Sequence, residues 1–163
     1  MVFHAQFLFA HGDPAGAEGY ARRTIELRPD AAFPFGILEK SLARQGKLSA
    51  AWDAVVAGVA IDAEEFDDFA AVAGFVIEPL GLDLSVELAV EAVRVHPGVA
   101  PLRVWLAALY TQAGEFDLAW AEFDTVLGLG PSATARELAV QCIELCDDPV
   151  ELRDLRQAFS AGG

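Results

Sequence analysis

Residues 100–133 decide the fold, and they read APLRVWLAALYTQAGEFDLAWAEFDTVLGLGPSA. Apolar residues recur in this stretch at every third and fourth position, which is the period of an amphipathic helix. Gly114 interrupts the first apolar run and Pro131 follows the second, and both residue types end helices. The stretch therefore predicts two helices, at 100–113 and 116–129, joined by a tight turn.

The same pattern recurs when the sequence is shifted by 34 residues. One aligned column contains glycines, at Gly12, Gly46 and Gly114, with Leu80-Gly81 displaced by one residue. A second column contains small residues, Ala17, Ala51, Ser85 and Ala119, and a third contains prolines, Pro29, Pro97 and Pro131, with Ala63 as the exception. Apolar columns follow the same shift: Leu8, Leu42, Val76 and Tyr110; Ile25, Val59, Val93 and Leu127; Leu27, Ile61, Val95 and Leu129. A fixed period of this length is the signature of a repeat protein.

Each column has a physical meaning. A small residue lets the second helix of a hairpin approach the first closely. A glycine ends the first helix because it tolerates a positive φ, and a proline ends the second because it has no N–H to donate. We expect the large apolar columns to fill the layers between successive hairpins.

The motif Leu106-Ala107-x2-Tyr110…Gly114…Ala119-x3-Phe123…Pro131 resembles the tetratricopeptide repeat family, whose unit is a 34-residue helix–turn–helix. The chain departs from that family at the first aromatic slot, which holds Arg103. The resemblance implies an all-α, right-handed α-solenoid of about five hairpins, in a single domain over residues 1–163. Its repeats would span about 1–31, 32–65, 66–99 and 100–133, and a capping hairpin would span 134–163.

Ten helices are predicted, at 2–11, 14–28, 33–45, 48–60, 65–78, 83–96, 100–113, 116–129, 133–146 and 149–160. Asp13-Pro14 and Asp148-Pro149 each place an N-cap carboxylate before a proline at the first helical position. Asp62 and Glu65 have the spacing of a capping box, and Asp83 is predicted to cap the helix that follows Leu82.

Composition restricts the class of partner. The chain has 25 acidic and 11 basic residues, for a net charge of −14, and this charge repels the phosphates of nucleic acids and anionic membranes. No apolar run reaches the roughly 18 residues of a membrane span, so membrane insertion is not expected. Two cysteines do not make a disulfide framework, which favours a soluble protein of a reducing compartment, the cytoplasm.

The sequence contains no catalytic or phosphate-binding motif, so we expect no enzyme activity and no cofactor. The three histidines, His4, His11 and His96, lack metal-ligand spacing. Cys142 and Cys146 lie one helical turn apart and are best interpreted as small buried residues. Trp52 and Trp120 share a repeat slot, two periods apart, and are predicted to pack between hairpins.

In tetratricopeptide arrays the first helices of the hairpins line a concave groove that binds peptides. The resemblance therefore implies nine candidate groove residues: Gln6, Lys40, Arg44, Gly74, Ile77, Val104, Ala108, Thr111 and Gln112. Small and apolar side chains dominate the predicted groove, and Gln6, Lys40, Arg44 and Gln112 are its polar members.

The expected function is that of a non-catalytic protein–protein interaction module or scaffold. It would bury a hydrophobic or basic segment of a protein or peptide partner in the groove, and a second copy in a homodimer is one candidate partner.

Two alternative functions stay open. One is a bacterial secretion-type chaperone, because Phe33-Pro34-Phe35 with Glu39 and Gly46 is loosely similar to part of the chaperones for translocator proteins. The other is an accessory domain of a larger enzyme, such as a glycosyl- or sulfotransferase.

Overall fold

The computed structural model describes residue 8 and residues 12–62, 78–131, 133–144 and 157–159. Across these residues all regular secondary structure is helical and none is strand. The chain divides into two compact units, Met1–Leu80 and Gly81–Gly163. The predicted all-α class is confirmed.

Seven of the predicted helices are confirmed, and each begins and ends within two residues of its predicted bounds. The first unit holds α2 (Pro14–Leu27), α3 (Phe33–Arg44), α4 (Leu48–Ile61) and the 3-10 turn η1 (Glu78–Leu80). The second unit holds α6 (Leu82–Val95), α7 (Ala100–Gln112), α8 (Phe116–Gly128) and α9 (Ala133–Glu144). The helices predicted at 2–11, 65–78 and 149–160 lie largely outside the described residues.

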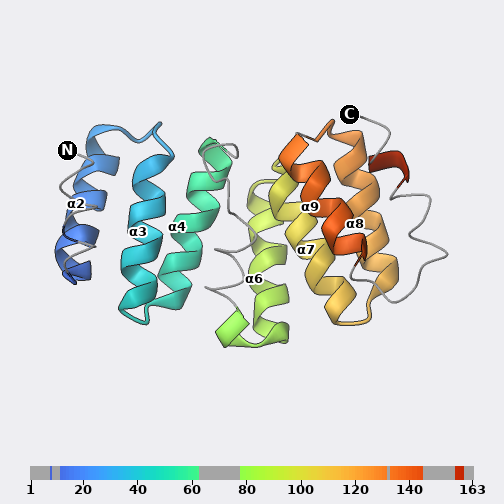
Figure 1. The fold of residues 1–163 in the computed structure, drawn as a ribbon, viewed down its shortest axis with the longest axis horizontal. Helices are drawn as coiled ribbons and strands as arrows, with labels where there is room; N and C mark the ends of the chain where they lie inside the picture. The colour runs from blue at the N-terminus through green and yellow to red at the C-terminus, as the bar shows by residue number, and fades with distance from the viewer. Residues whose placement is uncertain (1–7, 9–11, 63–77, 132, 145–156, 160–163) are drawn as a thin grey trace. The chain divides into compact units, whose positions relative to one another are not determined.

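Consecutive helices of each unit run antiparallel, and α9 runs in the same direction as α7 (Figure 1). In the first unit α3 packs against both α2 and α4, and in the second α7 packs against α6, α8 and α9. In the predicted repeats, α3 and α7 are first helices of their hairpins, and α2, α4, α6 and α8 are second helices.

The same backbone hydrogen bond recurs in three turns after first helices, at spacings of one and two 34-residue periods. A backbone N–H reaches back five residues to a carbonyl oxygen: Asp13 to Leu8 (2.9 Å), Lys47 to Leu42 (3.0 Å) and Glu115 to Tyr110 (2.8 Å). This bond, closed around a left-handed glycine, is the Schellman motif of helix C-termini. The enclosed glycines have φ of 80°, 73° and 76°, at Gly12, Gly46 and Gly114. The predicted role of the glycine column is therefore confirmed, because a side chain at positive φ is strained.

The displaced member of the glycine column also has a positive φ, but it begins a helix. Gly81 (φ 85°) is the N-cap of α6, and its carbonyl oxygen accepts from the Ser85 N–H (3.0 Å) and hydroxyl (2.7 Å). Asp83 lies inside the first turn and makes no capping hydrogen bond, so the prediction that it caps this helix is wrong. The helix starts one residue earlier than predicted, which leaves the Asp83 carboxylate to interact with the helix dipole alone. The Asp13 cap is confirmed, since its Oδ1 accepts from the Gly16 N–H at 2.8 Å.

The small-residue column is buried, as expected of a position where one helix approaches another closely. Its four members are all buried: Ala17, Ala51, Ser85 and Ala119. Ser85 is tolerated there because its hydroxyl donates to its own helix N-cap rather than remaining unpaired.

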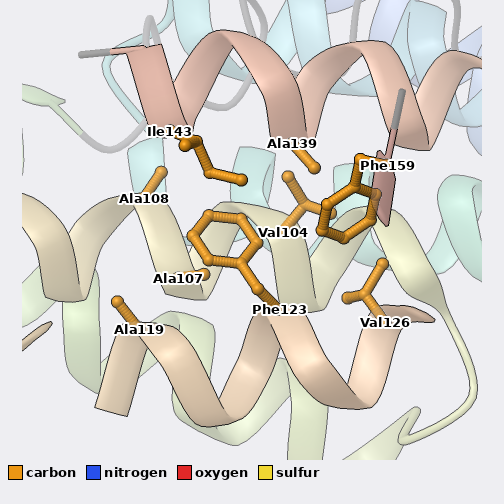
Figure 2. Close-up of a cluster of buried hydrophobic side chains, with 9 residues drawn as sticks. All are labelled: Val104, Ala107, Ala108, Ala119, Phe123, Val126, Ala139, Ile143 and Phe159. Atoms are coloured by element: carbon orange, nitrogen blue, oxygen red, sulfur yellow. The ribbon is translucent and has the colours of Figure 1, made fainter. Parts of the chain in front are cut away.

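The second unit has a well-packed core centred on Phe123 (Figure 2). The ring lies among buried side chains of three helices: Val104, Ala107 and Ala108 of α7, Ala119 and Val126 of α8, and Ala139 and Ile143 of α9. Phe159 meets Phe123 edge to face, with ring centroids 6.1 Å apart and an interplanar angle of 76°. An aromatic pair of this geometry contributes about 0.5–1.5 kcal/mol beyond its buried area.

Candidate functional site

Six of the nine groove candidates can be placed. Lys40 and Arg44 lie on α3, and Val104, Ala108, Thr111 and Gln112 lie on α7. Gln6, Gly74 and Ile77 lie outside the described residues.

The two apolar candidates on α7 are buried, which corrects their placement in an accessible groove. Val104 is fully buried and Ala108 is 8% exposed. Figure 2 shows Ala139 and Ile143 of α9 on the helix that faces them, within one hydrophobic cluster. The reason is repeat stacking, because these slots of a first helix receive the first helix of the following hairpin. A ligand cannot reach them while α9 is docked.

The remaining described candidates have polar side chains. Lys40 and Arg44 are exposed and one helical turn apart, and Gln112 is exposed on α7. Thr111 is half-buried, and its hydroxyl donates to the Ala107 carbonyl oxygen at 2.9 Å. The accessible side chains of these first helices therefore offer hydrogen bonds and positive charge rather than the small apolar surface that was predicted.

Exposed apolar surface lies on the second helices instead. In the described part of the chain, every large exposed hydrophobic side chain belongs to a second helix or its C-terminal end: Leu27, Ile61, Leu84, Val90, Val95, Phe116, Leu118, Trp120 and Leu129. Four of these exposed residues, Leu27, Ile61, Val95 and Leu129, form one of the apolar columns that was predicted to fill the layers between hairpins. For this column the prediction is wrong. These residues stand at the last helical position or the C-cap, where the chain leaves the packed layer.

The richest group lies on α8, and we call it the α8 surface: exposed Phe116, Leu118, Trp120 and Leu129, together with exposed Glu115, Asp117 and Asp124. Phe116 and Trp120 are one turn apart and share a side of the helix. By the same helical geometry, Asp117 and Asp124 lie between that side and Leu118. Residues 115–129 contain no lysine or arginine, so the charged side chains that this helix places between its exposed apolar residues are all negative.

The fourth carboxylate of α8 is already paired. Glu122 accepts from Arg103 Nη1 at 2.6 Å, while Arg103 Nε donates to the Pro97 carbonyl oxygen at 2.7 Å. Both side chains are largely buried, so the pair joins α7 to α8 within the hairpin. The residue that departs from the repeat pattern, Arg103, thus has a structural partner, and only the three exposed carboxylates are left facing solvent on this helix.

A second polar cluster joins α2 to the end of α3. Glu18 accepts from Arg22 Nε (2.9 Å), Gln45 Nε2 (2.8 Å) and Lys47 Nζ (3.0 Å). The hydrogen bonds from Lys47, Gln45 and Arg22 lower the pKa of the Glu18 carboxyl from 4.5 to about 2. The cluster binds two helices together and has a structural role.

Among the residues placed in the structure, no three His, Cys, Asp or Glu side chains are grouped closely enough to hold a metal ion. None of the described helices is long and apolar enough to cross a membrane. Cys146 and the side chain of Cys142 fall outside the described residues.

No known family model matches the chain, and no curated protein matches it in sequence. Solved structures do resemble it, among them MamA, YrrB and TTC0263. MamA is 16% identical in sequence, and the match covers 97% of this chain and 89% of MamA with a TM-score of 0.48. YrrB, described as a TPR protein with an unusual peptide-binding site, is 18% identical, and the match covers 96% of this chain and 83% of YrrB with a TM-score of 0.48. TTC0263, a TPR protein of Thermus thermophilus, is 17% identical, and the match covers 97% of this chain and 94% of TTC0263 with a TM-score of 0.47. The 34-residue register of the chain's own turns carries the fold assignment. By that register, the protein is an all-α repeat protein built from tetratricopeptide-like helical hairpins.

Proposed function

We propose that this protein is a non-catalytic interaction module that binds a basic, amphipathic segment of a partner protein at the α8 surface. The observation that carries the proposal is the combination of exposed Phe116, Leu118 and Trp120 with carboxylates and no basic residue on one helix.

Two physical effects support binding at this surface. Removing apolar side chains from water is favourable by about 25 cal/mol per Å², and tryptophan is among the residues that contribute most to protein interfaces. The exposed carboxylates attract a positively charged segment and accelerate its association. A partner with lysines or arginines beside an apolar stripe satisfies both requirements.

A second copy of the chain fits the α8 surface less well, because each copy carries a net charge of −14. An α8-to-α8 contact would bring the carboxylates of both copies together. The homodimer expected from the sequence would therefore need another contact surface. Light scattering at tens of micromolar distinguishes a dimer from the 17.4 kDa monomer.

The polar surface of the first helices is a second candidate contact. Lys40 and Arg44 are both exposed and provide positive charge on an acidic protein, which suits an acidic or carboxylate-bearing ligand. Gln6, Gly74, Ile77, Thr111 and Gln112 stay candidates for this groove. A secretion-type chaperone or an enzyme's accessory domain would use these same surfaces. A gene that lies beside secretion genes would favour the chaperone, and a catalytic domain in the same reading frame would favour the accessory domain.

The test uses two designed helical peptides with the same leucine stripe, one carrying lysines and the other glutamates. Calorimetry measures their affinities, and NMR amide shifts locate the binding site. We expect the lysine peptide to bind, with shifts concentrated on α8, and the glutamate peptide not to bind.

Variants sharpen the test. Leu118→Ser with Trp120→Ser should remove most of the binding, and Asp117→Lys with Asp124→Lys should weaken it. Leu27→Ser is the matched control, because Leu27 is an exposed aliphatic residue of the other unit. Equal binding of both peptides, or full binding by a folded Leu118→Ser, Trp120→Ser protein, would contradict the proposal.

A further inference from the structure

Glu39 occupies a slot that α7 fills with alanine. Two repeat periods separate Glu39 on α3 from Ala107 on α7. Ala107 is fully buried beside Phe123 in the core of the second unit (Figure 2). Glu39 is likewise buried, with 3% of the residue exposed. An ionisable side chain therefore occupies a position where the repeat pattern favours a small apolar one.

One oxygen of the Glu39 carboxyl, Oε2, is buried without a hydrogen bond. Ser41, a buried hydroxyl on the same helix, donates to the Ile37 carbonyl oxygen at 2.7 Å. Burying a charged carboxylate without partners is costly, so the folded state favours the neutral acid.

Charged groups on the neighbouring described helices do little to offset this cost. On α2 and α4 and at their ends, the charged residues are Asp13, Glu18, Arg22, Arg23, Glu26, Arg28, Lys47, Asp53 and Asp62. All of them are exposed except Glu18, which accepts hydrogen bonds from Arg22, Gln45 and Lys47. On α3 itself Arg44 and Lys40 are exposed, and the charge of Lys40 favours ionisation of Glu39. Burial outweighs Lys40 and raises the pKa of Glu39 from 4.5 to about 7.

We propose that Glu39 makes the α3–α4 hairpin a pH-dependent element, which is packed while this carboxyl is protonated and loosens when it ionises. The α7–α8 hairpin, with Ala107 in the same slot, lacks the device. It responds to pH through its other groups only.

The sign of the effect follows from proton binding. Below pH 4.5 Glu39 is protonated in both the folded and the unfolded chain and has no effect. Between pH 4.5 and about 7 the unfolded chain loses this proton while the folded one keeps it, so stability falls as pH rises. Above pH 7 the penalty is complete, and it corresponds to a change in the unfolding equilibrium constant of roughly a few hundred-fold.

The direct test is a carbon-13 NMR titration of the Glu39 carboxyl in the intact wild-type chain. We expect a midpoint near pH 7, in a resonance that Glu39→Gln removes. A midpoint near 4.5 would overturn the proposal, and this measurement does not depend on any variant folding.

Hydrogen exchange tests the structural consequence. Amide protection factors are measured at pH 5.5 and 8.0 and corrected for the intrinsic pH dependence of exchange. Protection of α3 and α4 should fall by at least tenfold more than protection of α7 and α8. Glu39→Gln and Glu39→Ala should abolish that difference, whereas Glu26→Gln, which changes an exposed carboxylate of the same unit, should retain it. Equal losses in both hairpins of the wild type, or an unchanged difference in folded Glu39→Ala, would overturn the proposal.

Discussion

Trp52 and Trp120 occupy the same repeat slot, yet Trp52 is 2% exposed and Trp120 is 37% exposed. Both follow directly on the small residue of the close helix approach, Ala51 or Ala119. The predicted packing role thus agrees with the burial of Trp52 alone, and Trp120 belongs to the exposed α8 surface.

This difference predicts different costs for the same substitution. Trp52→Ala should destabilise the protein by about 3–5 kcal/mol, the usual range for removing a large buried aromatic side chain. Trp120→Ala should cost clearly less, because part of its ring already faces water. Urea denaturation of the two variants makes the comparison, and equal losses would show that the two sites do not differ in packing.

The close-approach column predicts sensitivity to added volume. Ala51→Leu and Ala119→Leu should each cost about 1–3 kcal/mol through overpacking between paired helices. The control is Ala121→Leu on the exposed side of α8, whose free energy of unfolding should stay within about 0.5 kcal/mol of the wild-type value. Denaturation midpoints report all three, and wild-type midpoints for Ala51→Leu and Ala119→Leu would place the close approach elsewhere.

Burial of Ala108 predicts that enlarging it disrupts folding rather than ligand binding. Ala108→Trp should lower the thermal midpoint strongly, because its neighbours Phe123 and Ile143 leave no space for an indole. Gln112→Trp, at an exposed position one turn away, should leave the midpoint nearly unchanged. A stable Ala108→Trp protein would mean that α9 does not stay docked on α7.

The Glu18 cluster predicts loss of stability in acid. Its folded pKa lies near 2 and its unfolded pKa near 4.5, so its contribution is complete above pH 4.5 and disappears as pH falls toward 2. Glu18→Gln should therefore lower the urea midpoint at pH 7 and have progressively less effect between pH 4.5 and 3. A destabilisation that is independent of pH over this range would assign the loss to packing instead.

Reversing the charge of Lys40 and Arg44 predicts opposite effects on two ligand classes. The double change to glutamate should make the binding free energy of an acidic or carboxylate-terminated ligand less favourable by roughly 1.5–3 kcal/mol for each charged hydrogen bond removed. A basic ligand should bind more tightly after the reversal. Calorimetry with an acidic and a basic peptide separates these outcomes, and unchanged affinities would exclude the α3 surface from binding.

The hairpin register could be predicted from the sequence because it rests on local constraints. A positive φ at Gly46 or Gly114 and the end of a helix before Pro97 depend on a residue's own backbone and its near neighbours. Recurrence at a fixed period then multiplies a weak local signal into a strong one. Even so, a one-residue displacement at Gly81 was enough to misplace the cap of α6.

Exposure could not be predicted in the same way, because it depends on which distant segment covers a side chain. Val104 and Ala108 are buried in a cluster to which α8 and α9 contribute, and Leu27 is exposed at the last position of α2. Neither fact follows from the periodicity of a single helix. Local sequence was therefore enough to predict the seven described helices and their turns. Which apolar and ionisable side chains remain in water depends on how the helices pack, because burial is a property of the packed layers and not of the residue.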